Sequence, residues 1–157
     1  NGSAMEAALR AFPGVPHRLE LIRNLDGIDW INDSKATNYD AAEVALRAVK
    51  GPLVALAGGE AKQGDASAWI AALQRSAKAV VLFGAAQSHF QELLLSGGYT
   101  GVIQCCDALP EAVAAARQLS QREHCRAVLL SPACASFDQY RDFEARGEHF
   151  RSLTEGL

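Results

Sequence analysis

The sequence predicts an α/β domain with a Rossmann-like, mostly parallel sheet of about six strands, one antiparallel strand, and helices on both faces. Short apolar runs such as LVALA (53–57) and AVVLF (79–83) show no polar alternation, as expected for strands covered on both faces. Stretches with helical spacing separate these runs. The pair Asp26-Gly27 lies between two strand-like runs, which is typical of a β-hairpin.

The expected elements follow in a regular order. The hairpin strands cover 17–24 and 27–32, and the later strands cover 53–57, 79–83, 102–106 and 127–130. Helices are expected over 40–50, 66–77, 86–95, 110–120 and 137–153. We find no internal repeat or linker, so residues 5–157 are expected to form one domain, and residues 1–4, which precede Met5, an expression scar.

Composition excludes several classes of protein. The net charge of −3 argues against a general nucleic-acid binder. No apolar run approaches the roughly 20 residues of a membrane span, and no signal-peptide pattern is present. The four cysteines lack CxxC spacing and the four histidines lack an HxxxH pair, so no transition-metal site is expected. We therefore expect a cytoplasmic domain that binds neither nucleic acid nor membrane.

Three polar loops follow predicted strands and precede predicted helices: NDSKATN (32–38), GGEAKQGD (58–65) and SPACAS (131–136). Because the carboxyl ends of parallel strands share one edge of a sheet, these loops are expected to meet there. They would bring together Lys35, Thr37, Lys62 and Ser136 beside helix N-termini, whose free N–H groups favour negative charge. The pattern predicts a site for a small polyanion.

Other interpretations of these residues remain open at this point. Thr37 and Ser136 each match a helix-capping pattern, and both lysines could be solvated loop residues. Arg18 could face water or contact a nucleotide. GGEAKQG is not a phosphate-binding P-loop, and ACASF lacks the glycines of a serine-hydrolase elbow. The aromatic residues 137, 140, 143 and 150 have helical spacing, which is typical of a buried helix face.

Four stretches carry a family resemblance: FPGVPHRLE (12–20), WINDSKATN (30–38), LAGGEAKQGD (56–65) and LLSPACASFDQYRDFEARGEHF (129–150). Together they resemble the C-terminal domain of the Mur ligases. HRxE resembles the family in general, whereas NDSKATN and SPACASFDQ resemble its D-glutamate-adding members. The resemblance covers the chain from about Phe12 to its end.

The resemblance implies an ATP- and Mg²⁺-dependent ligase that joins D-glutamate to UDP-N-acetylmuramoyl-L-alanine through an acyl phosphate, in peptidoglycan precursor synthesis. It implies that this domain binds D-glutamate and closes the ATP site, that N-terminal and central domains are absent, and that the domain alone is inactive. By position, the D-glutamate pocket would be lined by Thr37, Lys62, Ser136, Phe137 and Phe143, and the nucleotide would face Arg18, Asp33 and Lys35. Alternatives are a Mur-type domain for another amino acid, or a free-standing α/β module that binds an amino acid or nucleotide.

Overall fold

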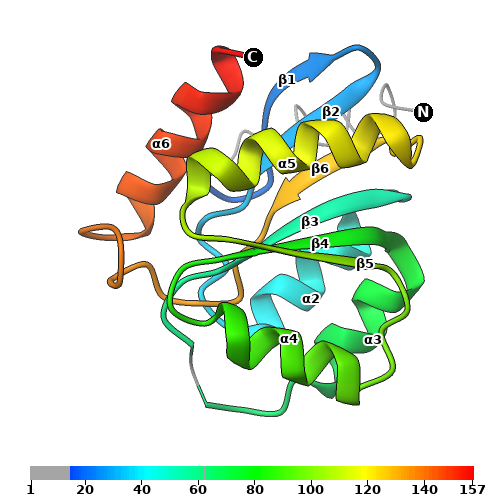
Figure 1. Ribbon diagram of the computed structural model, residues 1–157. Coiled ribbons are helices and arrows are strands. Elements are labelled where there is room, and N and C mark those ends of the chain that lie inside the picture. Colours follow the sequence, from blue (N-terminus) through cyan, green and yellow to red (C-terminus); the bar gives the residue numbers. More distant parts are fainter. Residues whose placement is uncertain (1–14, 62) are drawn as a thin grey trace.

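The computed structural model describes residues 15–61 and 63–157 of the chain. Its centre is one six-stranded sheet with the order β1-β2-β6-β3-β4-β5 (Figure 1). The strands are β1 (Glu20–Leu25), β2 (Ile28–Asn32), β3 (Leu53–Gly58), β4 (Ala77–Phe83), β5 (Val102–Cys106) and β6 (Ala127–Leu130). Only β1 is antiparallel to its neighbour, and the other pairings are parallel. The predicted fold class is confirmed.

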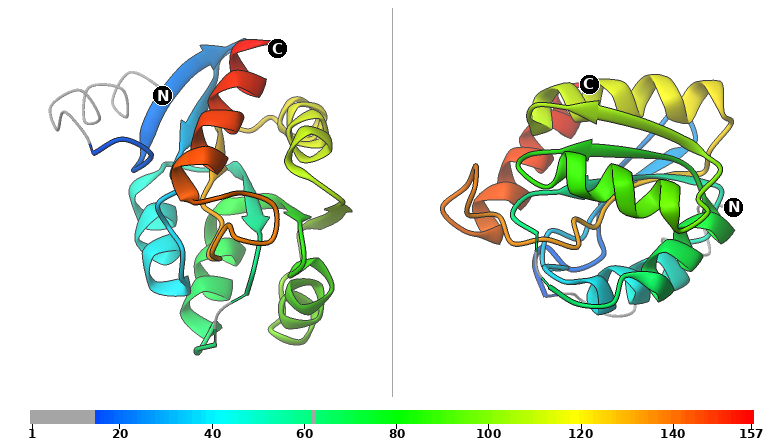
Figure 2. Two further views of the ribbon diagram at one scale, coloured as in Figure 1. Left: turned by 90° about the vertical axis from the view of Figure 1, so that its left-hand side faces the viewer. Right: turned by 60° about the horizontal axis from the view of Figure 1, so that its bottom comes forward.

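Helices cover both faces of this sheet (Figures 1 and 2). On one face, α2 (Tyr39–Ala48), α3 (Ser67–Ser76) and α4 (Gln87–Ser96) pack on a core that includes Trp69 and Phe90. On the other face, α5 (Leu109–Arg122) and α6 (Phe143–Glu155) pack on a core that includes Trp30 and Phe150. Burial of these apolar surfaces on both sides explains why the inner strands read as uninterrupted apolar runs.

The last helix begins later than the sequence suggests. Residues 137–142 were expected to be helical, but α6 begins at Phe143 because the Asp142 side chain accepts a hydrogen bond from the Ala145 N–H at 2.7 Å. The predicted aromatic face is therefore only partly correct. Phe150 is fully buried in the core, whereas Phe137 lies in the preceding loop with 68% of its surface exposed.

The sheet order determines which loops are neighbours. Strand β6 pairs with β2 on one side and with β3 on the other, so it occupies an inner position. The loop after β6 consequently lies between the loops that follow β2 and β3. These are the β2–α2 loop (33–38), the β3–α3 loop (59–66) and the β6–α6 loop (131–142), and we call the edge that they share the rim.

Candidate functional site

The β2–α2 loop uses its last side chain to cap α2 and leaves Lys35 and Thr37 out of the cap. The N-cap of α2 is Asn38, whose Oδ1 accepts the Ala41 N–H at 2.8 Å. Thr37 is half-buried and Lys35 is exposed. The interpretation of Thr37 as a cap is therefore wrong, and its hydroxyl is not committed to the first turn of the helix.

The three residues predicted to face a nucleotide line one pocket of about 260 Å³. Arg18, Asp33 and Lys35 contribute its polar part. Its apolar part is formed by Leu19, Ala36, Ala41, Val44 and Ala45. An apolar wall beside two cationic side chains suits a flat ring that carries anionic groups.

Asp33 forms hydrogen bonds that connect the segments around this pocket. Its Oδ1 accepts the Leu19 N–H at 3.1 Å and its Oδ2 accepts the Ser131 hydroxyl at 3.0 Å. Burial raises the pKa of this carboxyl to about 6, and the two hydrogen bonds and the charge of Arg18 partly oppose the effect. Both carboxylate oxygens already have partners within the protein, so Asp33 first of all fixes the segment that carries Arg18 onto the rim.

The β6–α6 loop is hydrogen-bonded to both neighbouring loops. The Ala133 N–H donates to the carbonyl of Ala36 at 3.0 Å, which links it to the β2–α2 loop. Glu60 and Ala135 exchange two backbone hydrogen bonds, of 2.8 and 3.1 Å, which link it to the β3–α3 loop. The structure thus brings the predicted loops together, as expected from the sheet topology.

Ser136 and Phe137 follow directly after this junction, and Phe137 is exposed whereas Ser136 is not. Ser136 is buried, and its carbonyl accepts the N–H groups of Gln139 and Tyr140 in a turn. No helix begins there, so the interpretation of Ser136 as a helix cap is wrong. Lys62, which is also predicted to contact the amino acid, lies outside the described residues.

Arg146 is the main site residue that sequence reasoning missed. Its side chain is fully buried, and it donates to the Ser34 hydroxyl and carbonyl at 2.9 and 2.7 Å and to the Cys134 carbonyl at 3.0 Å. Burial lowers the pKa of this guanidinium to about 10. A signal existed in the sequence, because Arg146 lies between Phe143 and Phe150 on the expected inner face of the last helix.

Phe143 lies beside this arginine at the start of α6. Its carbonyl accepts the Ser34 hydroxyl at 2.7 Å, and its ring meets the buried ring of His17 edge to face, with 6.2 Å between centroids. The His17 carbonyl in turn accepts the Lys35 N–H at 3.0 Å. Phe143, predicted to contact the amino acid, is therefore connected to the loop that carries the nucleotide-side residues.

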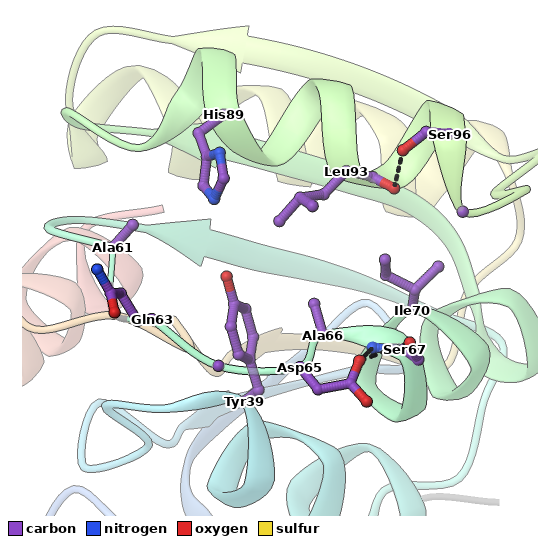
Figure 3. Close-up of a pocket in the computed structure, with 12 residues that line it drawn as sticks. Tyr39, Ala61, Gln63, Asp65, Ala66, Ser67, Ile70, His89, Leu93 and Ser96 are labelled. Atoms are coloured by element: carbon purple, nitrogen blue, oxygen red, sulfur yellow. Dashed lines mark hydrogen bonds between the residues drawn. The ribbon is translucent and has the colours of Figure 1, made fainter.

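A second, larger hollow of about 580 Å³ adjoins the β3–α3 loop (Figure 3). Tyr39 and His89 extend into it from α2 and α4, and Asp65 and Ser67 lie at the start of α3. Asp65 accepts hydrogen bonds from the Ser67 N–H and hydroxyl, which lower its pKa. Sequence analysis singled out none of these side chains, because they converge only through the packing of α4 beside α3.

Two negative findings concern the described part of the chain. Among its His, Cys, Asp and Glu side chains, no group of three or more is placed to hold a metal ion. Within those same residues, no helix has the length and apolar character needed to cross a membrane.

Fold and rim together define an α/β ligand-binding domain with an apolar pocket and cationic side chains at the carboxyl ends of its strands. The chain belongs to the Mur ligase family: the model of the Mur ligase glutamate ligase domain matches residues 17–134. It is 58% identical to the UDP-N-acetylmuramoylalanine–D-glutamate ligase of Prochlorococcus marinus over 96% of this chain and 33% of that protein. The same-named protein of a Synechococcus species is 59% identical, over 96% of this chain and 32% of that protein. The chain thus spans about a third of the length of these curated relatives.

Solved structures share the fold at lower sequence identity. A folylpolyglutamate synthase of Mycobacterium tuberculosis, complexed with ADP and AMPPCP, has a TM-score of 0.65 at 17% identity, over 96% of this chain and 35% of that one. The UDP-N-acetylmuramate–alanine ligase of Thermotoga maritima has a TM-score of 0.57, also at 17% identity, over 96% of this chain and 32% of that one. These similarities show that the fold of this chain is shared by a folylpolyglutamate synthase and by a second muramate ligase.

Proposed function

We propose that this chain is the C-terminal domain of an ATP-dependent ligase that joins D-glutamate to UDP-N-acetylmuramoyl-L-alanine in peptidoglycan precursor synthesis. One observation carries the proposal: the rim loops that resemble D-glutamate-adding enzymes are hydrogen-bonded to one another, in a chain 58% identical to a protein with that name. The location that follows for such an enzyme is the cytoplasm, where nucleotide substrates are made.

The proposed reaction has two chemical steps. The terminal phosphoryl group of ATP passes to the carboxylate of the muramoyl-alanine, which gives ADP and an acyl phosphate. The amine of D-glutamate then attacks the acyl carbon, and the tetrahedral intermediate collapses with loss of inorganic phosphate and a proton. The contribution of this domain is to hold D-glutamate with its amine aimed, which saves most of the entropic cost of the second step.

The residues divide between the two ligands. We assign Thr37, Lys62, Ser136, Phe137 and Phe143 to the D-glutamate pocket, since two carboxylates require several converging donors. We assign Arg18, Lys35 and, through its support of that pocket, Asp33 to the nucleotide. We place the binding of Mg²⁺ mainly on the other domains of the enzyme, as the family resemblance implies.

A chimera tests the proposal, with this chain in place of the corresponding third of the Prochlorococcus marinus ligase. Phosphate release is measured with ATP, UDP-N-acetylmuramoyl-L-alanine and one amino acid at a time. We expect release with D-glutamate and only background with L-glutamate, L-alanine or L-lysine. Release with another amino acid alone would instead support a Mur-type ligase of different specificity.

The third possibility, a free-standing binding module, is tested on the chain itself. Calorimetry with D-glutamate and with ATP measures whether it binds either ligand without other domains. We expect weak binding of both, because a pocket that closes against a partner domain is incomplete alone. Tight binding of D-glutamate by the chain, together with an inactive chimera, would favour the binding module.

A further inference from the structure

Two exposed side chains directly after Ser136 and Phe137 reach across the rim to other loops. The Asp138 Oδ2 accepts the Ala85 N–H at 2.9 Å, at the end of β4. The Gln139 Nε2 donates to the carbonyl of Asp107 at 2.7 Å, at the end of β5. We call Asp138 and Gln139 the clamp. The hydrogen bonds described above between the rim loops do not involve Asp138 or Gln139. Neither residue is assigned to D-glutamate or to the nucleotide.

The clamp holds one end of a short segment whose other end is also held. Before Ser136, Ala135 is paired with Glu60 through two backbone hydrogen bonds. After Phe137, the clamp binds the loops that follow β4 and β5. Ser136 and Phe137, two of the residues assigned to the amino acid, therefore lie between a backbone anchor on one side and a side-chain anchor on the other.

The backbone at Gly84 leaves room for the side chain of Asp138. Gly84 has a φ of +78°, and a Cβ at this position would lie 2.5 Å from the Asp138 Oδ2. The Gly84 N–H also donates to the carbonyl of Asp107, at 3.3 Å, so the two loops that the clamp binds are hydrogen-bonded to each other. A residue with a side chain at position 84 would push Asp138 away.

Because the clamp is exposed, its effect on the position of the Ser136 segment can be separated from its effect on the folding of the domain. Asp138 and Gln139 are both exposed, whereas Ser136 between the two anchors has only 2% of its surface exposed. Hydrogen bonds at exposed positions contribute little to global stability, because water replaces them when they are lost. Loss of the clamp should consequently loosen the Ser136 segment while the rest of the domain stays folded.

We propose that Asp138 and Gln139 are positioning residues that set the Ser136–Phe137 segment for the incoming amino acid. This inference rests on the proposed function, and it concerns the acceptor side only. Arg18 and Lys35 belong to other segments, which are held by His17 and Asp33. Removal of the clamp should therefore raise the KM for D-glutamate and leave the KM for ATP unchanged.

The test compares Asp138→Ala and Gln139→Ala in the chimeric ligase. We expect the KM for D-glutamate to rise about five- to tenfold in each, as is typical when one hydrogen bond is lost. Asp138→Asn keeps an oxygen that can accept the Ala85 N–H, so it should restore a KM near that of the unsubstituted chimera. Gln139→Glu has the same size but cannot donate to a carbonyl, so it should behave like Gln139→Ala.

Gln74→Ala is the matched control. Gln74 is also an exposed glutamine that ties two segments together, through hydrogen bonds of 2.8 and 2.9 Å with Thr100, but it lies at the last turns of α3, away from the rim. We expect this variant to leave both KM values unchanged.

Three results would overturn the proposal: an unchanged KM for D-glutamate in Gln139→Glu, a parallel rise of both KM values, or an equal effect of Gln74→Ala. Melting temperatures of all variants show whether each chain is folded. D-glutamate-dependent phosphate release by the unsubstituted chimera tests the proposed function separately, so the two failures are distinguishable.

Discussion

The substitution Asp33→Asn should change how the stability of this domain depends on pH. Only 4% of the Asp33 surface is exposed, and burial raises the pKa of its carboxyl from 3.8 to about 6. The folded protein therefore holds this proton more tightly than the unfolded chain does. Asparagine has a similar shape and can still accept the Leu19 N–H, but it does not titrate.

The sign and size of the effect follow from linkage. Because the folded pKa is the higher one, the stabilisation is fully present below the unfolded pKa and is lost as the pH rises through the folded pKa. A rise in pKa from 3.8 to about 6 corresponds to about 3 kcal/mol for complete ionisation. Between about pH 4.5 and about pH 7.5, roughly 2 kcal/mol of this difference should appear.

Urea denaturation at these two pH values, followed by the fluorescence of buried Trp30 and Trp69, measures the effect. We expect the unfolding free energy of Asp33→Asn, relative to the unsubstituted protein, to increase by about 2 kcal/mol from the lower to the higher pH. Asp40→Asn, at an exposed position in the first turn of α2, is the control and should show a much smaller change. Parallel pH dependences of Asp33→Asn and the unsubstituted protein would refute the reasoning, as would a difference of opposite sign.

Three further substitutions test the supports of the rim by chemical denaturation. Arg146→Met should cost about 3 kcal/mol, because the buried carbonyls of Ser34 and Cys134 lose their donor. Asn38→Ala should cost about 1 kcal/mol through loss of the α2 cap. Gly59→Ala should cost more than about 2 kcal/mol, since its φ is +129° and a Cβ would lie 2.3 Å from the Ala135 carbonyl oxygen.

Matched controls separate these causes from general effects of substitution. Arg47→Met removes an exposed arginine that pairs with Glu43 on α2, and it should cost less than about 1 kcal/mol. Gly98→Ala meets no atom within 4 Å although its φ is +88°, so it measures backbone strain without a steric clash. Equal losses for Arg146→Met and Arg47→Met, or for the two glycine variants, would contradict the structural explanation. For Asn38→Ala, unchanged stability would show that the cap contributes nothing.

The sheet and the meeting of the rim loops could be predicted because both follow from local patterns. The hairpin signal at Asp26-Gly27 placed one antiparallel strand beside a parallel sheet. The topology rule for carboxyl ends then placed Lys35, Thr37 and Ser136 on one edge. Each step needed only a few neighbouring residues and the general geometry of α/β folds.

The start of α6 and the role of Arg146 could not be predicted in the same way. Ser136 and Gln139 have the spacing of a capping box, but the loop around them bonds to other loops, and Asp142 caps the helix instead. Arg146 donates to the carbonyl and the hydroxyl of Ser34, which is 112 positions away in the chain. The helical spacing of Arg146 with Phe143 and Phe150 indicates a place on the inner face, but it carries no information on a partner so distant in the chain, which only the folded structure identifies.

The inner place of β6 has a consequence for how the protein is made. During synthesis, the strands on either side of this position emerge from the ribosome long before the strand that joins them. Until Ala127–Leu130 arrives, β2 and β3 each have an unpaired edge, which is a template for association with other chains. Nascent chains that stop short of this strand should therefore depend on chaperones and aggregate readily, and the rim is completed only when β6 and the loop after it have been made.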